Sequence, residues 1–128
     1  MRERKFRAWD YHFHKMYYDN ETLKVCNNIM FFHTYDMGWQ ISKANCDYCQ
    51  FTGLKDKNKK DIYEGDIFFI SNPVTSEHNK KYEVVFKNAC FVGELKTAGD
   101  WGYVNLEDWH PRLEVIGNIY ENPELLTN

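Results

Sequence analysis

Most of what this sequence predicts about its structure lies in one run, Phe51-Thr52-Gly53-Leu54-Lys55-Asp56-Lys57-Asn58-Lys59-Lys60-Asp61-Ile62-Tyr63-Glu64-Gly65-Asp66-Ile67. Glycines in such a run allow positive φ, and Thr, Asn and Asp side chains bond nearby main-chain groups. We expect a turn at Thr52-Gly53, a charged loop tip from Lys55 to Lys60, and a second turn at Glu64-Gly65-Asp66 that fixes the register of the next strand. The run contains no nucleophile–base pair and no phosphate-binding loop, so it predicts a fold and no chemistry.

Apolar segments of strand length follow that run. Ile67–Ile70 is apolar throughout, which is typical of a strand buried on both faces or nearly so. Tyr82–Phe86 and Cys90–Leu95 predict a β-hairpin, and because Ala89 adopts the left-handed conformation reluctantly, we expect a longer, bulged turn between them. The side chains that we expect in the core are Ile67, Phe69, Val84, Phe86, Phe91 and Val115.

Weaker patterns complete the prediction on both sides. Toward the N-terminus, Arg4–Asp10 and Met16–Tyr18 predict a hairpin, and 20–50 predicts short strands joined by turns, with a helix over 41–48 as the alternative. The remaining expected elements are a polar loop at 71–80, a turn at 97–101, strands at 103–106 and 113–120, the second with a glycine kink, and a capped helical turn at 122–126.

The spacing of these elements predicts the fold class. Many short strands with turn signals about every 8–12 residues are typical of a small antiparallel barrel or sandwich. No linker rich in Pro, Gly or Ser divides the 128 residues, so we expect a single domain over 1–128. The residues therefore predict a mostly β fold, a small antiparallel barrel or sandwich with short peripheral helical turns.

Composition restricts the class of protein further. The chain carries 16 basic and 19 acidic residues, a net charge of −3, which disfavours binding to duplex nucleic acid by charge alone. Its aromatic share of 17% favours β structure. There is neither an apolar stretch of about 18 residues nor an apolar region after the basic N-terminus. We therefore expect a soluble cytoplasmic protein whose four cysteines are reduced.

Five blocks of this sequence together form a recognisable pattern: Lys5–Asp10, Phe51–Asn58, Ile62–Ile67, Val84–Phe86 and Glu114–Leu125. In these blocks the chain resembles one known family, the YopX-like proteins of bacteriophages and prophages. The resemblance implies an SH3-like β-barrel in which the turn within Tyr63–Ile67 leads into a barrel strand. It implies no established activity, catalytic residue or cofactor. The residues that it marks as the motif defining the fold are Thr52, Gly53, Asp56, Tyr63, Glu64, Gly65, Asp66, Gly117 and Asn118.

The chain also departs from the family pattern. Lys59 and Ala89 stand where the family usually has glycine, so both loop tips are expected to differ in shape. The segments 19–50 and 97–112 match the family poorly, and a function specific to this chain is expected there.

Three groups of residues invite a chemical interpretation. Cys46-Asp47-Tyr48-Cys49 has the spacing of half a zinc site or of a redox pair, but Cys26 and Cys90 stand alone and no strand–helix–strand pattern surrounds it. We interpret it as small, partly buried residues, with metal and redox roles as alternatives. We interpret His12 and His14 as solvated turn residues, and Asp108-Trp109-His110 as lacking a nucleophile. We thus expect no metal, cofactor or catalytic residue.

The residues with the best claim to an interaction are charged or aromatic. The loop offers Lys55, Lys57, Lys59 and Lys60 as point charges, diluted by Asp56 and Asp61. Trp39, Trp101 and Trp109 lie in the poorly matching segments and are the tryptophans most expected to be exposed.

These observations favour a phage or prophage accessory protein that acts as a non-enzymatic binding module in the bacterial host. We expect a protein partner rather than nucleic acid because of the acidic balance. The alternatives are a nucleic-acid-binding module that uses the Lys55–Lys60 loop and aromatics, an enzyme with a site in 19–50 and 97–112, and a structural protein that assembles into a homo-oligomer. The sequence does not identify the partner.

Overall fold

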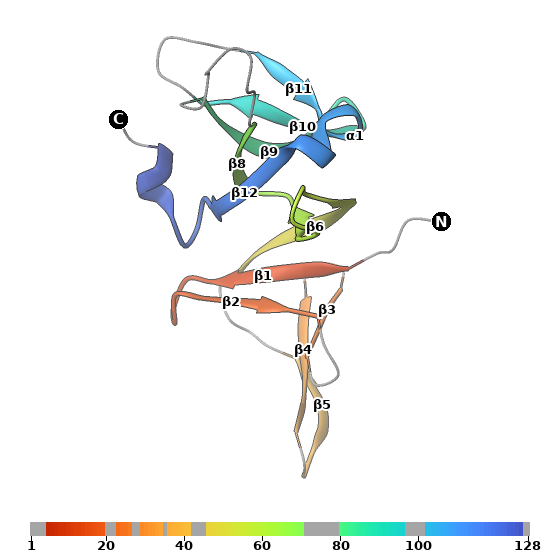
Figure 1. Cartoon of the computed structure of the whole chain (residues 1–128). Coiled ribbons are helices and arrows are strands. Elements are labelled where there is room, and N and C mark those ends of the chain that lie inside the picture. Colours follow the sequence, from red (N-terminus) through yellow and green to blue (C-terminus); the bar gives the residue numbers. More distant parts are fainter. Residues whose placement is uncertain are drawn as a thin grey trace. The chain divides into compact units, whose positions relative to one another are not determined.

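The computed structural model describes residues 5–19, 23–26, 29–34, 36–41, 46–70, 80–96 and 102–126. They are mostly β, in antiparallel sheets with short peripheral helical turns (Figure 1), which confirms the predicted class. The chain forms two compact units, Met1–Phe51 and Thr52–Asn128. The expectation of a single domain stays a prediction. No helix in the described part of the chain is long and apolar enough to cross a membrane.

The first unit is built from hairpins. β1 (Phe6–Asp10) pairs with β2 (Lys15–Tyr18) on one side and with β6 (Cys46–Lys55) on the other. β3 (Leu23–Cys26), β4 (Ile29–Thr34) and β5 (Gly38–Ile41) form a separate three-stranded sheet.

The predicted N-terminal hairpin is confirmed, and its turn is held by Asp10, whose Oδ1 accepts hydrogen bonds from the amides of His12 and Phe13. The alternative helix over 41–48 is wrong at Ile41 and at Cys46–Tyr48, which are strand, while 42–45 lie outside the described residues.

The second unit is a five-stranded antiparallel sheet that curls around a core (Figure 1). Its strand order is β11-β10-β9-β8-β12, and β7 (Asp61–Tyr63) belongs to the four-stranded sheet β2-β1-β6-β7. The strands are β8 (Asp66–Ile70), β9 (Lys81–Lys87), β10 (Cys90–Leu95), β11 (Tyr103–Asn105) and β12 (Leu113–Asn118). The helical turns are α1 (Leu106–Trp109), η1 (His110–Arg112) and η2 (Pro123–Leu126).

Apolar side chains from nearly every element of this unit meet in one core. Its buried members are Ile62, Phe68, Val84, Phe91, Leu106, Leu113 and Val115. Of the six predicted core residues, Ile67, Val84, Phe91 and Val115 are buried and Phe69 is half-buried.

Phe86 contradicts the core prediction, because 53% of it is exposed. It lies on the same face of β9 as the buried Val84, but it pairs with Phe91 close to the turn of the hairpin. Alternation of apolar residues identifies which face of a strand points inward and does not identify where along the strand the core ends.

The predicted turn at Thr52-Gly53 is also wrong, since both residues lie within β6. Gly53 takes a φ of 88°, and the Thr52 hydroxyl donates to the Ile62 carbonyl oxygen (2.8 Å) and accepts from the Leu54 amide (3.2 Å). A glycine in the left-handed region is one way to deform a strand without ending it. These residues therefore shape the strand and do not reverse it.

Gly117, the other glycine predicted to perturb a strand, does perturb β12. The β8–β12 register shifts between Val115 and Gly117, which confirms the expected kink. A Cβ at Gly117 would lie 2.5 Å from Asn122 Oδ1, so any larger residue would displace this side chain. The helical turn expected after it is present as η2.

The β9–β10 turn is tighter than predicted. Lys87 pairs with Cys90, which leaves a two-residue loop, and Asn88 and Ala89 have φ of 53° and 64°. Positive φ at both positions is the geometry of a type I′ turn, whose twist matches that of the flanking strands. The positive φ that the strand twist favours is thus adopted even though alanine disfavours it. The polar loop expected at 71–80 and the turn expected at 97–101 lie outside the described residues, except for Lys80.

The conformation of Ala89 leads to a prediction about stability. Ala89→Gly should raise the free energy of unfolding by about 1 kcal/mol, because it removes a Cβ from the left-handed region at a modest entropic cost. Urea unfolding at unchanged m-value measures it. Ala8→Gly, at a fully buried strand position, should instead destabilise the protein. An unchanged or lowered stability of Ala89→Gly would contradict the turn geometry.

Candidate interaction surface

Asp56 organises the loop after β6 from the inside. Its side chain is 5% exposed; Oδ1 accepts from the amides of Asn58 (2.8 Å) and Lys60 (2.9 Å), and Oδ2 accepts from the amide of Val115 (3.0 Å). Three main-chain donors satisfy a buried carboxylate. The role of Asp56 is therefore structural, and its negative charge is directed away from the loop surface.

The Tyr63–Asp66 turn is organised in the same way. Asp66, only 2% exposed, accepts from the Tyr63 amide at 2.8 Å. Gly65 has a φ of 90°, donates to the Val84 carbonyl oxygen and accepts from the Ile119 amide, both at 2.9 Å. Glycine here allows two other segments to approach the backbone directly. Glu64 between them is half-buried.

Asn118 caps the segment that follows β12. Its Oδ1 accepts from the amides of Tyr120 (3.0 Å) and Glu121 (2.7 Å), and its Nδ2 donates to Glu121 Oε1 (2.8 Å). These motif residues thus bond mainly to main chain, and they hold the loops between strands in place.

The four lysines expected at the loop tip are all exposed in the structure. We call residues 55–60 the lysine loop. Lys55 pairs with Asp61 at 3.4 Å, and the Lys57 ammonium lies 6.0 Å from the centre of the Phe69 ring. Lys59 takes a φ of 65°, in the left-handed region.

The structure brings one of the three candidate tryptophans to this loop. His110 Nδ1 lies 2.9 Å from the Lys55 carbonyl oxygen, so η1 is fastened to the loop. Trp109, half-buried, precedes it, and the Arg112 guanidinium lies 5.7 Å from the Trp109 ring centre. Trp101 and the side chain of Trp39 lie outside the described part, although the Trp39 backbone belongs to β5.

A second group of exposed side chains lies at the turn end of the β9–β10 hairpin. Phe86, Lys87 and Cys90 flank this turn, and Tyr103, which lies opposite Glu94 in β11, reaches Lys87 with its side chain. We call Phe86, Lys87, Cys90 and Tyr103 the hairpin end; all four are exposed. The Lys87 ammonium donates to the Tyr103 hydroxyl and lies 4.4 Å from the centre of that ring, and this hydrogen bond raises the pKa of Lys87. On the other face, the rings of Phe86 and Phe91 meet edge to face at 4.9 Å.

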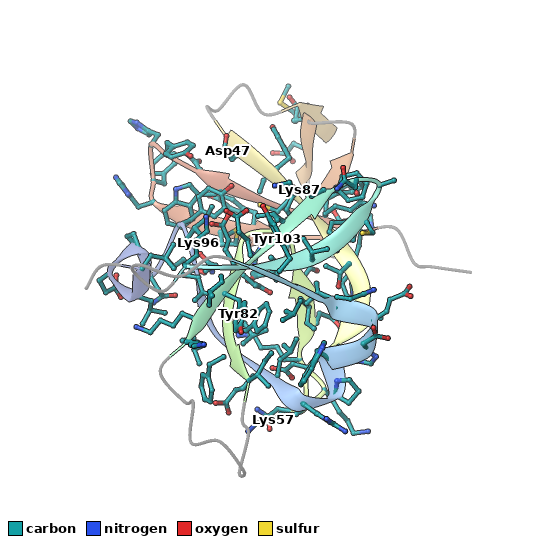
Figure 2. The ribbon with its side chains drawn as sticks, turned by 90° about the horizontal axis from the view of Figure 1, so that it is seen from above. Asp47, Lys57, Tyr82, Lys87, Lys96 and Tyr103 are labelled. Atoms are coloured by element: carbon teal, nitrogen blue, oxygen red, sulfur yellow. The ribbon has the colours of Figure 1, made fainter. Side chains whose placement is uncertain are left out.

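Sequence reasoning missed Phe86 and Tyr103 as surface residues. Phe86 follows the core period of its strand, and Tyr103 meets Lys87 only because β11 pairs with β10. Figure 2 shows Lys87 and Lys57 at opposite ends of this unit, so the hairpin end and the lysine loop are separate surfaces.

A row of charges lies on the same face of the sheet as Lys87. Lys96 Nζ lies 3.0 Å from Glu94 Oε1 and 3.6 Å from Glu83 Oε1. Burial raises the pKa of the Glu83 carboxyl despite the nearby ammonium, and the hydrogen bond to Glu94 raises the pKa of Lys96. The row carries both signs of charge.

The arrangement of Cys46 and Cys49 does not favour a joint role of the two thiols in metal binding or redox chemistry. Cys46 and Cys49 are three residues apart in β6, and successive side chains of a strand alternate between its faces, so the two thiols point to opposite sides. Burial, and then the Asp10 carboxylate, raise the pKa of the Cys46 thiol, which keeps it protonated.

Within the described residues no group of three or more His, Cys, Asp or Glu side chains gathers as metal ligands do. His12 and His14 lie exposed in the β1–β2 turn, where their rings contact Phe13 and Trp9 respectively. The expected absence of a bound metal stays a prediction.

The Tyr63–Asp66 turn gives a prediction about stability. Gly65→Ala should destabilise the second unit by about 1 kcal/mol or more, because alanine resists a φ of 90°. Asp66→Ala should cost about 1–3 kcal/mol, because it leaves the buried Tyr63 amide without its acceptor. Chemical denaturation of both variants measures these losses. Unchanged melting temperatures together with lost partner binding would show instead that the turn is a functional site.

The Tyr11 hydroxyl gives a prediction about pH. It donates to Asp47 Oδ2 at 2.6 Å, and this bond raises the Tyr11 pKa from 10.0 to about 12. Because the pKa in the folded state is the higher one, the bond contributes to stability below pH 10 and is lost as pH rises through about 12. In an ultraviolet titration of tyrosinate, Tyr11→Phe should remove the last ionisation step. Asp47→Asn should shift that step toward pH 10. An identical titration curve in Asp47→Asn would exclude the bond.

Two solved structures are similar to this chain over nearly its whole length. The chain is similar along its length to the crystal structure of protein EF1440 from Enterococcus faecalis, with 26% identity, a TM-score of 0.60, and coverage of 98% of this chain and 99% of that one. It also has the fold of protein yopX from Bacillus subtilis, with 22% identity, a TM-score of 0.63, and coverage of 100% and 98%.

None of the curated proteins compared with the chain matches it. The family model described as YopX protein matches residues 5–127, nearly the whole chain. The resemblance seen in the motif residues is thereby confirmed, and the chain belongs to the YopX family.

Proposed function

We propose that this YopX-family chain is a non-enzymatic phage or prophage accessory module that binds a protein partner in the cytoplasm of its bacterial host. The observation that carries the proposal is the exposure of two large aromatic residues at the hairpin end, 53% for Phe86 and 47% for Tyr103. Tyrosine and other aromatic side chains supply much of the energy of protein–protein interfaces.

Both aromatic residues are held in place before any partner arrives. The Phe86 ring packs on Phe91, which is 7% exposed, and the Tyr103 hydroxyl accepts a hydrogen bond from the Lys87 ammonium. A side chain that is already ordered loses little conformational entropy on binding. The hairpin end therefore has the rigid, amphipathic contacts that a protein interface uses.

The charges around the hairpin end favour a protein over nucleic acid. Glu83 and Glu94 flank Lys96 on the same sheet face as Lys87, so that face carries both signs. Phosphate backbones require a surplus of cations, whereas the rim of a protein interface is polar and of mixed charge. The net charge of −3 supports the same choice.

The alternative of an enzyme places its site in the segments 19–50 and 97–112. In the second of these segments, His110 directs Nδ1 to the main-chain oxygen of Lys55, and Asn105 Oδ1 accepts from the Glu107 amide as a helix cap. Those contacts are structural ones, which supports a module without catalysis. A barrel-like fold does not by itself decide between binding and catalysis.

The test begins with capture of partners from the bacterial host, with bound protein and bound nucleic acid both sequenced. The complex is then formed again from purified components. Phe86→Ala and Tyr103→Ala should each weaken it at least about tenfold, while Phe13→Ala, whose ring is 68% exposed in the first unit, should not.

Stability measurements separate binding from folding. A fully buried phenylalanine would cost about 3–5 kcal/mol on truncation. Because Phe86 is half exposed, Phe86→Ala should cost about 1 kcal/mol. Unchanged affinity in both hairpin-end variants, or nucleic acid as the ligand they lose, would refute the proposal. Assembly into a homo-oligomer stays a prediction. Sedimentation equilibrium measures the oligomeric state.

A further inference from the structure

Lys59 stands where its backbone favours glycine. Its φ of 65° lies in the left-handed region, which non-glycine residues adopt at a cost. The surrounding bonds impose this conformation: the Lys59 amide donates to the Asp56 carbonyl oxygen at 2.9 Å, and the Asp56 carboxylate holds the amides on either side of Lys59. Strain that persists in an exposed, well-bonded loop is a pointer to function.

In and beside the lysine loop, the acidic side chains lie away from the lysines at the tip. Asp56 is turned inward, and Asp61 is engaged by Lys55, so the acidic residues that dilute the loop in sequence do not cover its tip. Lys59 and Lys60 are exposed, and neither forms an ion pair with any residue that the structure describes. The tip therefore presents adjacent ammonium groups to solvent.

A guanidinium lies on the element that is fastened to the loop. Exposed Arg112 ends η1, which is tied to the loop through His110 and the Lys55 carbonyl oxygen. The Lys57 amide adds a bond to the Leu113 carbonyl oxygen at 3.0 Å. The planar guanidinium of arginine binds carboxylates through two parallel hydrogen bonds.

We propose that the lysine loop and Arg112 form a second binding site, which takes an acidic segment of a protein partner. Carboxylates at successive positions of such a segment match the ammonium groups of the tip and the guanidinium beside it. A nucleic acid tracks a long cationic strip. Here the strip ends at α1, where Glu107 and Asp108 are exposed.

The site lies beyond the one assigned to the hairpin end. Lys57 lies over Phe69, which pairs with Lys81 at the start of β9, whereas the hairpin end follows Lys87. Phe86 and Lys87 are thus separated from the lysine loop by the length of β9, about 20 Å. The two sites can be tested independently.

The experiment uses the full chain with a labelled oligoglutamate peptide and, in parallel, a labelled oligothymidylate, in fluorescence anisotropy at low and at physiological salt. A triple variant with Lys57→Gln, Lys59→Gln and Lys60→Gln should weaken peptide binding roughly tenfold. Lys24→Gln, the same change at an exposed residue of β3, is the matched control and should leave the affinity unchanged.

The variant Lys59→Gly distinguishes a lysine that contacts the peptide from one that only shapes the loop. It should raise the melting temperature, because glycine relieves the positive φ, and weaken peptide binding about threefold, because it removes one charge. A merely structural lysine would leave the affinity unchanged. Phe86→Ala should not affect peptide binding.

Four outcomes would overturn the inference. They are no measurable binding of the peptide, equal losses in Lys24→Gln and the triple variant, unchanged affinity in Lys59→Gly, and tighter binding of oligothymidylate than of the peptide. None of them would alter the assignment of the hairpin end.

Discussion

The carboxylate of Asp56 accepts three main-chain hydrogen bonds, and much of the second unit is arranged around them. Two of these bonds close the loop that follows β6, and the third reaches the Val115 amide in β12. β12 in turn pairs with β8, whose Phe68 enters the core. A side chain without a carboxylate at this position would leave buried amides unsatisfied at two distant points of the chain. The loop and the sheet edge therefore depend on the same side chain.

The secondary structure was largely predictable because strand length and turn residues are local properties. The strands around Ile67 and Val84, the glycine kink at Gly117 and the helical turn after Asn122 all follow from neighbouring residues. The errors have tertiary causes. Whether Gly53 deforms a strand or ends it depends on what lies beside β6, and the twist of two paired strands imposes on Ala89 a conformation that its own side chain disfavours.

The candidate surfaces were predictable to a smaller extent. A run of lysines in a polar loop identifies an exposed tip, and the structure places it there. The inward rotation of Asp56, which changes the charge of that tip, depends on an amide nearly sixty residues later in the chain. Phe86 was expected in the core because its phase along β9 matches that of Val84. Whether an aromatic residue at a strand end is exposed depends on how far the core extends. The local sequence pattern does not determine that extent.

The position of Cys46 and Cys49 within a continuous strand has a consequence for oxidative stress. Three residues of extended chain separate their Cα atoms by about 10 Å, whereas a disulfide tolerates about 7 Å at most. Closing that ring would require β6 to leave β1, which pairs with it at both cysteines. The oxidised form of this pair is therefore incompatible with the folded first unit. An oxidant therefore cannot join these two sulfurs while the strand keeps its pairing with β1.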